Sequence, residues 1–334
     1  MPLVSTEGSC IRGIVCAVPK EKISNQHFSS LIGEENLQKF ETVTGISERR
    51  VVSNDVCASD LCVAAAESLF EKLQIDLTSI EAIVFVTQTP DYVLPATACA
   101  MQHRLGLGNC AAFDMNLGCS GYVYGLWLVS MMVAQKQFKR VLLLVGDTCS
   151  KFVSPLDKST APLFGDAGSA TLIDYSETGP ESHFLLGTDG SGVDNLIIPA
   201  GGFRTPATSE TSNDLYMNGG EIFNFTINQV SSAIQEITQA YPKPVDFYVF
   251  HQANKFMLEH LAKKLRLPKE QVLYSLNKFG NTSSASIPLT LVTTLEENRT
   301  KVLSLLIAGF GVGYSWAVGK VEIPTDMVMD LIEL

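Results

Sequence analysis

Short apolar runs rich in β-branched residues recur along the chain, and longer stretches with helical spacing separate them. Ile80–Thr87 and Lys139–Gly146 are such runs in the first half, and Val245–Phe250 and Lys301–Gly309 are similar runs in the second. A continuous apolar run of this length is typical of a strand covered on both faces. Strands that alternate with helices predict βαβ units and therefore a mostly parallel sheet covered by helices.

The remaining elements follow from the same periodicity. The sequence predicts helices over Asn25–Phe40, Ala58–Leu73, Pro95–Leu105, Tyr122–Ala134, Phe223–Ala240 and Phe256–Leu265, and further strands over Cys10–Val18, over Ala111–Met115 and within 164–173. From about residue 178 to 213 the composition shifts to Gly, Ser, Thr, Pro and Asp, which predicts a crossover or active-site loop region. Arg49 and Arg50 follow a turn and are expected to be a solvated surface pair.

The two halves of the chain share a pattern. KRVLLLVGD followed by FGDAGSATLI in the first half has the same order of apolar strand, glycine turn and second strand as KVLSLLIAGFGVGYSWAVG in the second. This repetition predicts an internal duplication. The 334 residues suffice for two domain-sized units or for one large fused core.

Charge and cysteine content exclude several classes of protein. The net charge of −11 argues against a general nucleic-acid binder, because phosphate neutralisation needs clustered Lys and Arg. The eight cysteines lack paired CxxC spacing, which favours a reduced intracellular chain over a disulfide framework or a zinc site. No signal peptide and no membrane-spanning helix are expected, because no basic segment with an apolar run opens the chain and no apolar run approaches 18 residues.

Cys119 lies between Gly118 and Gly121 in the segment DMNLGCSGYVYG. A strand before it and an apolar helix after it predict a sharp turn with the sulfur at the helix N-terminus. Backbone N–H groups and the helix dipole at that end favour the thiolate, which is the reactive form of cysteine. This segment alone does not separate a nucleophile from a small buried core residue, which is the commoner role of an unpaired cysteine.

His251 and Asn281 are the candidate partners of such a nucleophile. His251 follows directly on a predicted buried strand, and open α/β sheets bind ligands at the ends of such strands. Asn281 follows a glycine and precedes small hydroxyl residues, so its amide is suited to point into a site, although a helix-capping or turn asparagine explains the same pattern. The other histidines lie in segments that resemble helix surface or loop: His27, His103, His183 and His260.

Together with their neighbours, these residues resemble the β-ketoacyl-acyl-carrier-protein synthase III family, whose members have the thiolase fold. The matching segments are NLGCSGYVYGL around Cys119, FGDAGSA at 164–170, HQAN at 251–254, FGNTSSASIPLTL at 279–291, GFGVGYSW at 309–316 and TGISERR at 44–50. They follow the family order over almost the entire chain. The resemblance implies an α/β, thiolase-like fold with two duplicated βαβαβαββ halves in αβαβα layers. Residues 1–177 would carry the cysteine, and residues 178–334 would carry the histidine and asparagine.

The resemblance also implies a cytoplasmic acyltransferase that condenses two acyl thioesters without a metal or redox cofactor. Cys119 would take the acyl group of a primer, and the backbone N–H groups of Cys119 and Val312 would form the oxyanion hole. A malonyl thioester would then lose CO2, with His251 and Asn281 as hydrogen-bond donors to the enolate, and the product would be a 3-ketoacyl thioester. The implied partners are an acyl carrier protein, the acyl-CoA or acyl-ACP primer with malonyl-ACP, and a second copy in a homodimer.

The family pattern marks further substrate-binding positions, and this chain departs from it at several places. Leu94 aligns with a Phe that the neighbouring subunit contributes to the primer pocket, so the smaller side chain would admit a longer or branched primer. Lys39 and Val43 stand where members that use coenzyme A carry Trp and Arg, and Phe256 replaces a basic residue. Carrier-protein and CoA donors therefore both remain open. The implied substrate-binding residues are Leu94, Lys151, Asn254, Phe310, Gly311 and Gly313.

Other functions fit the sequence less well. An acyltransferase of the same fold could pass the acyl group to an oxygen or nitrogen acceptor without decarboxylation, but it would not need both His251 and Asn281. A non-catalytic partner subunit would be expected to lose these residues. A hydroxymethylglutaryl-type synthase would need a glutamate near Cys119, and a papain-like protease would have different residues around its cysteine. The primer, the extender, and the choice between fatty-acid initiation and a specialised pathway remain open.

Overall fold

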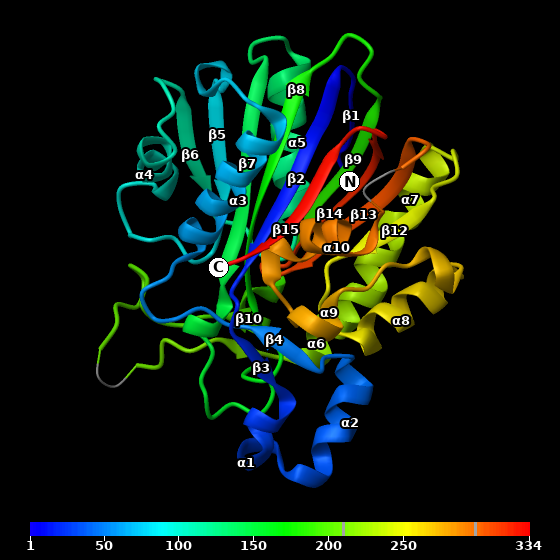
Figure 1. The fold of residues 1–334 in the computed structure, drawn as a ribbon. Coiled ribbons are helices and arrows are strands. Elements are labelled where there is room, and N and C mark those ends of the chain that lie inside the picture. Colours follow the sequence, from blue (N-terminus) through cyan, green and yellow to red (C-terminus); the bar gives the residue numbers. More distant parts are fainter. Residues whose placement is uncertain (209–210, 297–298) are drawn as a thin grey trace.

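Two mixed β-sheets form the frame of the protein (Figure 1). The computed structural model describes residues 1–208, 211–296 and 299–334. The six-stranded sheet has the order β15-β2-β8-β7-β5-β6, and the five-stranded sheet has the order β1-β9-β14-β13-β12. The strands of the first are β2 (Ser9–Val18), β5 (Ala82–Val86), β6 (Ala111–Met115), β7 (Arg140–Thr148), β8 (Asp166–Tyr175) and β15 (Val328–Glu333); those of the second are β1 (Leu3–Thr6), β9 (Ser182–Thr188), β12 (Phe247–Phe250), β13 (Leu303–Gly311) and β14 (Ser315–Ile323).

The two sheets repeat one strand order. In the first, β8 lies between β2 and β7, and β5 and β6 continue parallel to β7. In the second, β14 lies between β9 and β13, and β12 continues parallel to β13, with a parallel bridge from Tyr248 to Val272 in the place of a further strand. The prediction of a mostly parallel sheet is confirmed for the six-stranded sheet, in which only β8 runs against the other strands. The five-stranded sheet is mixed, because β1 and β14 run against β9, β12 and β13. Strands buried on both faces look alike in sequence whichever way they pair.

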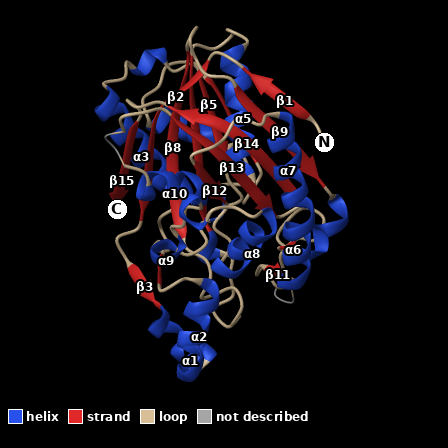
Figure 2. Cartoon of the chain, turned by 90° about the vertical axis from the view of Figure 1, so that its right-hand side faces the viewer, coloured by secondary structure: helices blue, strands red, loops and turns tan. Residues whose placement is uncertain are grey.

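The helices form three layers around the sheets (Figure 2). α5 (Gly121–Ala134) and α10 (Ser286–Thr294) contact both sheets and form the middle layer. α3 (Ala58–Leu73) and α4 (Thr97–Arg104) pack against the six-stranded sheet. α6 (Gly219–Phe225), a π-helical turn (Thr226–Val230), α7 (Ser231–Ala240) and α8 (Lys255–Leu265) pack on the side of the five-stranded sheet. None of the described helices is both long and apolar enough to cross a membrane.

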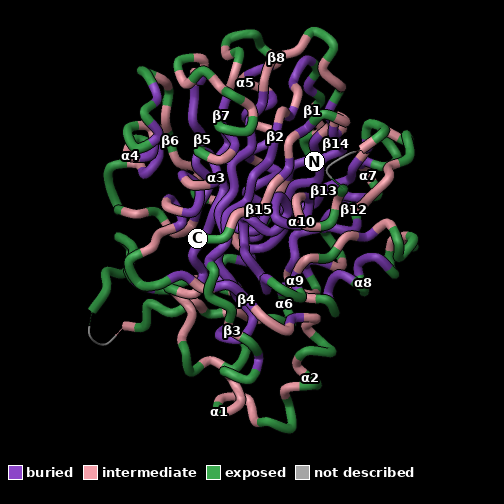
Figure 3. The backbone as a smooth tube through the Cα atoms, viewed as in Figure 1, coloured by how far each residue is buried: buried purple, intermediate pink, exposed green. Residues whose placement is uncertain are grey.

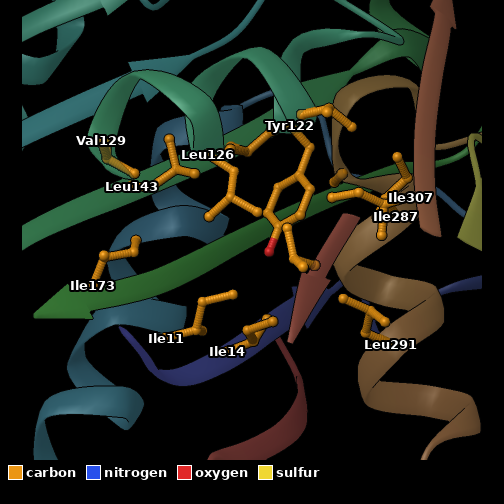
Figure 4. Packing of buried hydrophobic residues seen from close by; sticks show 14 of the residues in the cluster. Ile11, Ile14, Tyr122, Leu126, Val129, Leu143, Ile173, Ile287, Leu291 and Ile307 are labelled. Carbon is orange, nitrogen blue, oxygen red and sulfur yellow. The ribbon is translucent and has the colours of Figure 1, made fainter. Parts of the chain in front are cut away.

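The central core forms around α5, which is apolar on nearly all sides, as expected of a helix enclosed by other elements. Figure 4 shows side chains of both middle helices and both sheets that face one another: Tyr122, Leu126, Val129, Ile287, Leu291, Ile11, Ile14, Leu143, Ile173 and Ile307. Tyr122 is 1% exposed and lies one residue into the helix. This packing fixes the N-terminus of α5 between the sheets.

The loop region predicted over 178–213 contains a strand, and this part of the prediction is wrong. β9 lies between β1 and β14, and its Phe184 and Leu185 are fully buried. Later in the interval, Leu196–Ile197 (β10) pairs with Tyr216–Met217 (β11). Residues 209–210 lie outside the described part of the chain. The apolar run within β9 is short and flanked by polar residues, so it gave a weak strand signal. Its pairing with the distant strands β1 and β14 makes it a strand.

The single helix predicted over Asn25–Phe40 is also wrong. The segment forms a 3-10 turn (Asn25–Phe28), α1 (Ser29–Ile32) and α2 (Glu34–Thr44). Gly33 separates the helices with a φ of 88°, a conformation that interrupts a right-handed helix. α1 and α2 project away from the sheets at the bottom of Figure 1, and Figure 3 shows that they carry no buried segment.

Arg49 and Arg50 are buried, which corrects the prediction of a solvated pair. They lie on β4 (Glu48–Arg50), which pairs with β3 (Lys22–Ser24). Arg49 is fully buried, and its guanidinium donates to Asn25 Oδ1 at 2.6 Å and to the Pro162 carbonyl at 2.6 Å. Arg50 donates to Glu333 Oε1 at 2.7 Å. Burial lowers the pKa of Arg49 to about 10, so the side chain stays charged and is held by oxygen acceptors.

Candidate active site

Cys119, His251 and Asn281 come from three separate segments and line one pocket. Cys119 follows β6, His251 follows β12, and Asn281 precedes α10. All three residues are buried. Most of the other lining side chains are apolar: Phe152, Leu163, Phe164, Leu196, Leu215, Met217, Ile222, Met257, Phe310 and Val312. The arrangement suits an acyl chain beside a small polar centre.

The chain turns sharply at Cys119, as predicted. The Gly121 N–H donates to the Gly118 carbonyl at 2.7 Å, and α5 begins at Gly121. The side chain of Ser120 is tied to that of Ser315 by a hydrogen bond of 2.7 Å between their Oγ atoms. The turn therefore presents Cys119 at the N-terminus of the buried helix.

β13, from the second half of the chain, passes directly against Cys119. A Cβ atom on Gly311 would lie 2.8 Å from the Cβ and 2.9 Å from the Sγ of Cys119. On Gly309 it would lie 2.7 Å from the Cys119 carbonyl oxygen. These distances leave no room for a side chain, so the two glycines allow Cys119 to sit against the opposite sheet.

Burial keeps Cys119 protonated in the resting site. Desolvation, followed by the charge of Asp147, raises the pKa of the Cys119 thiol to about 11. A hydrogen bond from Ser283, whose Oγ lies 4.0 Å from Sγ, and the backbone N–H groups of Val312 and Cys119 act in the opposite direction. The backbone N–H groups at this turn favour the thiolate, as expected, but loss of hydration outweighs them. The N–H groups of Val312 and Cys119 lie close to the sulfur.

Asp147, which the sequence prediction missed, is fully buried behind the pocket. Its Oδ1 accepts hydrogen bonds from the Gln88 N–H at 2.7 Å and from Thr87 Oγ1 at 3.2 Å. Its Oδ2 accepts from the Ser284 hydroxyl at 2.6 Å and from the Ser284 N–H at 3.2 Å. Burial raises the pKa of this carboxyl. Asp147 thereby joins the loop after β5 to the segment that follows Asn281.

His251 is held as a neutral ring. Its backbone N–H donates to the Ala308 carbonyl at 2.8 Å, and its ring Nδ1 lies 2.8 Å from Ser286 Oγ. The ring meets Phe310 edge to face, with centroids 5.7 Å apart. Burial lowers the pKa of His251 to about 3. Both pKa shifts oppose a thiolate–imidazolium ion pair between these two pocket residues at neutral pH.

The amide of Asn281 is oriented by its own loop. Its Oδ1 accepts the Ser283 N–H at 2.9 Å, which is the turn geometry that the sequence also allowed. Its backbone bonds to Leu163 and Gly165 at 3.0 Å each and fixes the loop against the neighbouring segment. With Oδ1 engaged, the Nδ2 group is the part of the amide left to donate into the pocket.

The predicted substrate-binding residues fall into two groups. Asn254, Phe310, Gly311 and Val312 line the pocket, and Asn254 Oδ1 also caps α8 through the Met257 N–H at 2.8 Å. The pocket lining does not include Leu94, Lys151 or Gly313. Leu94 is 78% exposed in the loop before α4, and the Lys151 ammonium donates to the Asn54 carbonyl at 3.0 Å. Gln88, Cys149 and Ser283 also line the pocket, and only the hydroxyl-rich GNTSS segment gave a sequence signal for any of them.

Comparisons with known proteins agree with this geometry. A family model described as 3-oxoacyl-[acyl-carrier-protein (ACP)] synthase III matches residues 113–190, and the model of its C-terminal part matches 236–323. The chain is 34% identical over 320 residues to the beta-ketoacyl-[acyl-carrier-protein] synthase III of Clostridioides difficile strain 630, covering 93% of this chain and 97% of that protein.

Solved structures extend the similarity to the fold. A 3-oxoacyl-(acyl-carrier protein) synthase from Burkholderia xenovorans LB400 superposes with a TM-score of 0.96 at 41% identity, covering 100% of this chain and 99% of that one. The priming β-ketosynthase of the R1128 polyketide pathway superposes with a TM-score of 0.85 at 26% identity, covering 96% and 98%. The chain therefore belongs to the β-ketoacyl-acyl-carrier-protein synthase III family, the thiolase-fold condensing enzymes that act as acyltransferases.

Proposed function

We propose that Cys119 is the residue that carries the primer acyl group. Its sulfur attacks the carbonyl carbon of an acyl thioester, the bond to the carrier sulfur breaks, and the Cys119 proton leaves with the carrier thiol. The N–H groups of Cys119 and Val312 stabilise the oxyanion of the tetrahedral intermediate, and donors of this kind contribute about 3 kcal/mol each. Because the resting group is a thiol, proton loss accompanies the attack rather than preceding it.

In the second half-reaction, His251 and Asn281 act on a malonyl thioester. The C–C bond to the carboxylate breaks, CO2 leaves, and the electron pair becomes an enolate whose oxygen accepts hydrogen bonds from the His251 ring and Asn281 Nδ2. The enolate carbon then attacks the acyl group on Cys119, a C–C bond forms, and the Cys119 sulfur departs and takes up a proton from water. The observation that carries this proposal is that the three residues line one buried pocket, with the amide oxygen of Asn281 already bound by Ser283.

Measuring the two half-reactions separately tests these roles. His251→Ala and Asn281→Ala should still acquire the acyl group on Cys119, but CO2 release from a malonyl thioester should fall by about 100-fold or more, as for other lost oxyanion donors. Undiminished CO2 release in both variants would contradict the roles assigned here. Acyl transfer to an oxygen or nitrogen acceptor without CO2 release in the wild type would favour the non-decarboxylating alternative.

A homodimer and a carrier-protein donor complete the proposed function. β6 is an edge strand, and Tyr92, Val93 and Leu94 in the nearby loop are 61%, 79% and 78% exposed, which suits a second copy that covers β6 and receives this loop in its primer pocket. Leu94 would then set the space for the primer.

We also propose that residues 1–177 and 178–334 are two structural repeats, in line with the shared strand order of the two sheets. We further propose that the chain acts in the cytoplasm, where its eight unpaired cysteines would stay reduced.

The proposed donor is an acidic acyl carrier protein. Exposed cations gather on α8 and the loop after it, on a chain of net charge −11: Lys255, Lys263, Lys264, Arg266 and Lys269. Such a patch would steer an acidic partner. Faster loading of Cys119 from acyl-ACP than from acyl-CoA, lost in a Lys263→Glu/Arg266→Glu variant, would support this donor. Equal loading of Cys119 from acyl-ACP and acyl-CoA would contradict the preference for a carrier-protein donor. The identity of the preferred primer would then have to distinguish fatty-acid initiation from a specialised pathway.

A further inference from the structure

Ser286, the first residue of α10, contacts the far side of the His251 ring. Its Oγ lies 2.8 Å from His251 Nδ1 and 3.4 Å from the backbone N of Gln252. Ser286 is 1% exposed and His251 is 2% exposed, so neither group exchanges this contact for water. The hydroxyl is thus placed between a ring nitrogen and a backbone N–H.

The proton positions in this triangle follow from the chemistry of the groups. A backbone N–H can only donate, so the Gln252 N–H directs its hydrogen at Ser286 Oγ. The hydroxyl has one hydrogen of its own, and His251 Nδ1 is its remaining hydrogen-bond partner among the described residues. Nδ1 is therefore the acceptor, and in a neutral imidazole the proton then resides on Nε2.

Surrounding hydrogen bonds hold both ends of this contact in place. Gln252 is 1% exposed; its Nε2 donates to the Phe250 carbonyl at 2.7 Å, and its Oε1 accepts the Ser275 N–H at 3.0 Å. Thr290 Oγ1 donates to the Ser286 carbonyl at 2.7 Å. Ser275 Oγ lies 2.7 Å from Thr290 Oγ1, so these bonds join Gln252 to the first turn of α10 and hold the hydroxyl in a defined orientation.

We infer that Ser286 is a positioning residue that sets the tautomer of His251, so that Nε2–H, and not a lone pair, faces the extender thioester. The inference rests on the proposed function of His251 as a donor to the enolate. A neutral ring with the proton on Nδ1 would present a lone pair to the enolate oxygen and repel it. Because burial keeps the ring uncharged, its tautomer decides whether it can donate.

A Ser286→Ala variant tests this assignment through the two half-reactions. Acyl loading of Cys119 should stay within about twofold of wild type, while CO2 release should fall about tenfold or more, in kcat rather than KM, because the ring loses the partner that fixes its tautomer. Ser286→Cys, which keeps a weak donor, should recover part of the rate. Thr293→Val is the matched control, because it removes a hydroxyl hydrogen bond within α10 without touching Ser286 or His251, and it should preserve both half-reactions.

The 15N resonances of the His251 ring in the wild-type protein provide a readout that needs no variant. They should show an unprotonated Nδ1 and a protonated Nε2, and Ser286→Ala should shift them towards a mixture of tautomers. A protonated Nδ1 in the wild type, or equal losses of loading and CO2 release in Ser286→Ala, would overturn the inference. If instead His251→Ala decarboxylates normally, the proposed role of His251 fails while the 15N spectrum still reports the tautomer.

Discussion

At the scale of single residues, burial controls the charge of both reactive groups. It raises the pKa of Cys119 to about 11 and lowers that of His251 to about 3, so both are neutral over the whole range between these values. The uncharged His251 ring and the Asn281 amide can stabilise an enolate by donating hydrogen bonds. Because neither group is charged, neither would form an ion pair with the malonyl carboxylate before CO2 leaves. The protonated thiol also limits side reactions at the proposed nucleophile, because the thiolate is the reactive form.

Asp147 gives this electrostatic account a direct test. Its negative charge disfavours the thiolate, so Asp147→Asn should lower the pKa of Cys119 and shift the pH profile of Cys119 alkylation by iodoacetamide to lower pH. The wild-type rate should still be rising at pH 9. Asp166→Asn, at another buried carboxylate whose charge is not among the main influences on the pKa of Cys119, is the control and should shift the profile much less. A profile that stays or moves to higher pH in Asp147→Asn would contradict the account.

At the scale of elements, strong local periodicity was enough for some predictions. α3 and β6 have the predicted bounds, and α5 begins one residue before its predicted start. These segments are dominated by apolar residues whose spacing decides helix or strand. β9 was not predicted, because turn-forming residues flank it and because its pairing partners, β1 and β14, lie far away in the chain. The antiparallel strand directions were not predictable for the same reason.

The candidate site shows the same limit. Cys119, His251 and Asn281 could be found because each follows or precedes a recognisable element and because the segments resemble a family. Asp147 and Ser286 could not, since their importance comes from partners more than 30 residues away, Ser284 and His251. The burial of Arg49 could not be predicted for the same reason. Its guanidinium is held by the carbonyl of Pro162, which lies in a loop far away in the sequence.

β13 offers a test at this scale. Gly311→Ala would place a methyl group 2.9 Å from Cys119 Sγ, so the sulfur or the strand must shift. Acyl loading of Cys119 should fall by about 100-fold, because small misplacements of reacting groups are costly. The rate is measured by intact mass after exposure to an acyl thioester. Gly190→Ala, which adds a Cβ in open space, should load normally. Normal loading of Gly311→Ala would show that the close approach of β13 is not needed.

At the scale of the whole molecule, the ends of the chain tie the two sheets together. β1, at the N-terminus, pairs with β9 in the five-stranded sheet, and β15, at the C-terminus, pairs with β2 in the six-stranded sheet. The Arg50–Glu333 ion pair anchors the last strand further. The pocket is likewise shared, with Cys119 from the first half and His251 and Asn281 from the second. Separate folding of the halves would therefore leave both without a complete site.

The proposed dimer can be tested at edge strand β6. Phe113 is 37% exposed there, and Phe113→Lys should place a charge in the subunit contact and convert a dimer into monomers in sedimentation velocity. Tyr216→Lys, an exposed aromatic position on β11, should leave the dimer intact. A monomeric wild type, or an unchanged dimer in Phe113→Lys, would rule out this contact.

The most direct test of the central claim is to locate the acyl group after the protein has been exposed to a panel of acyl-CoA and acyl-ACP thioesters. Intact mass and peptide mapping should show one acyl group on the peptide that contains Cys119, and this group should disappear with CO2 release when a malonyl thioester is added. Cys119→Ala should acquire none. No adduct with any primer, or an adduct on Cys149 in the same pocket instead, would contradict the account.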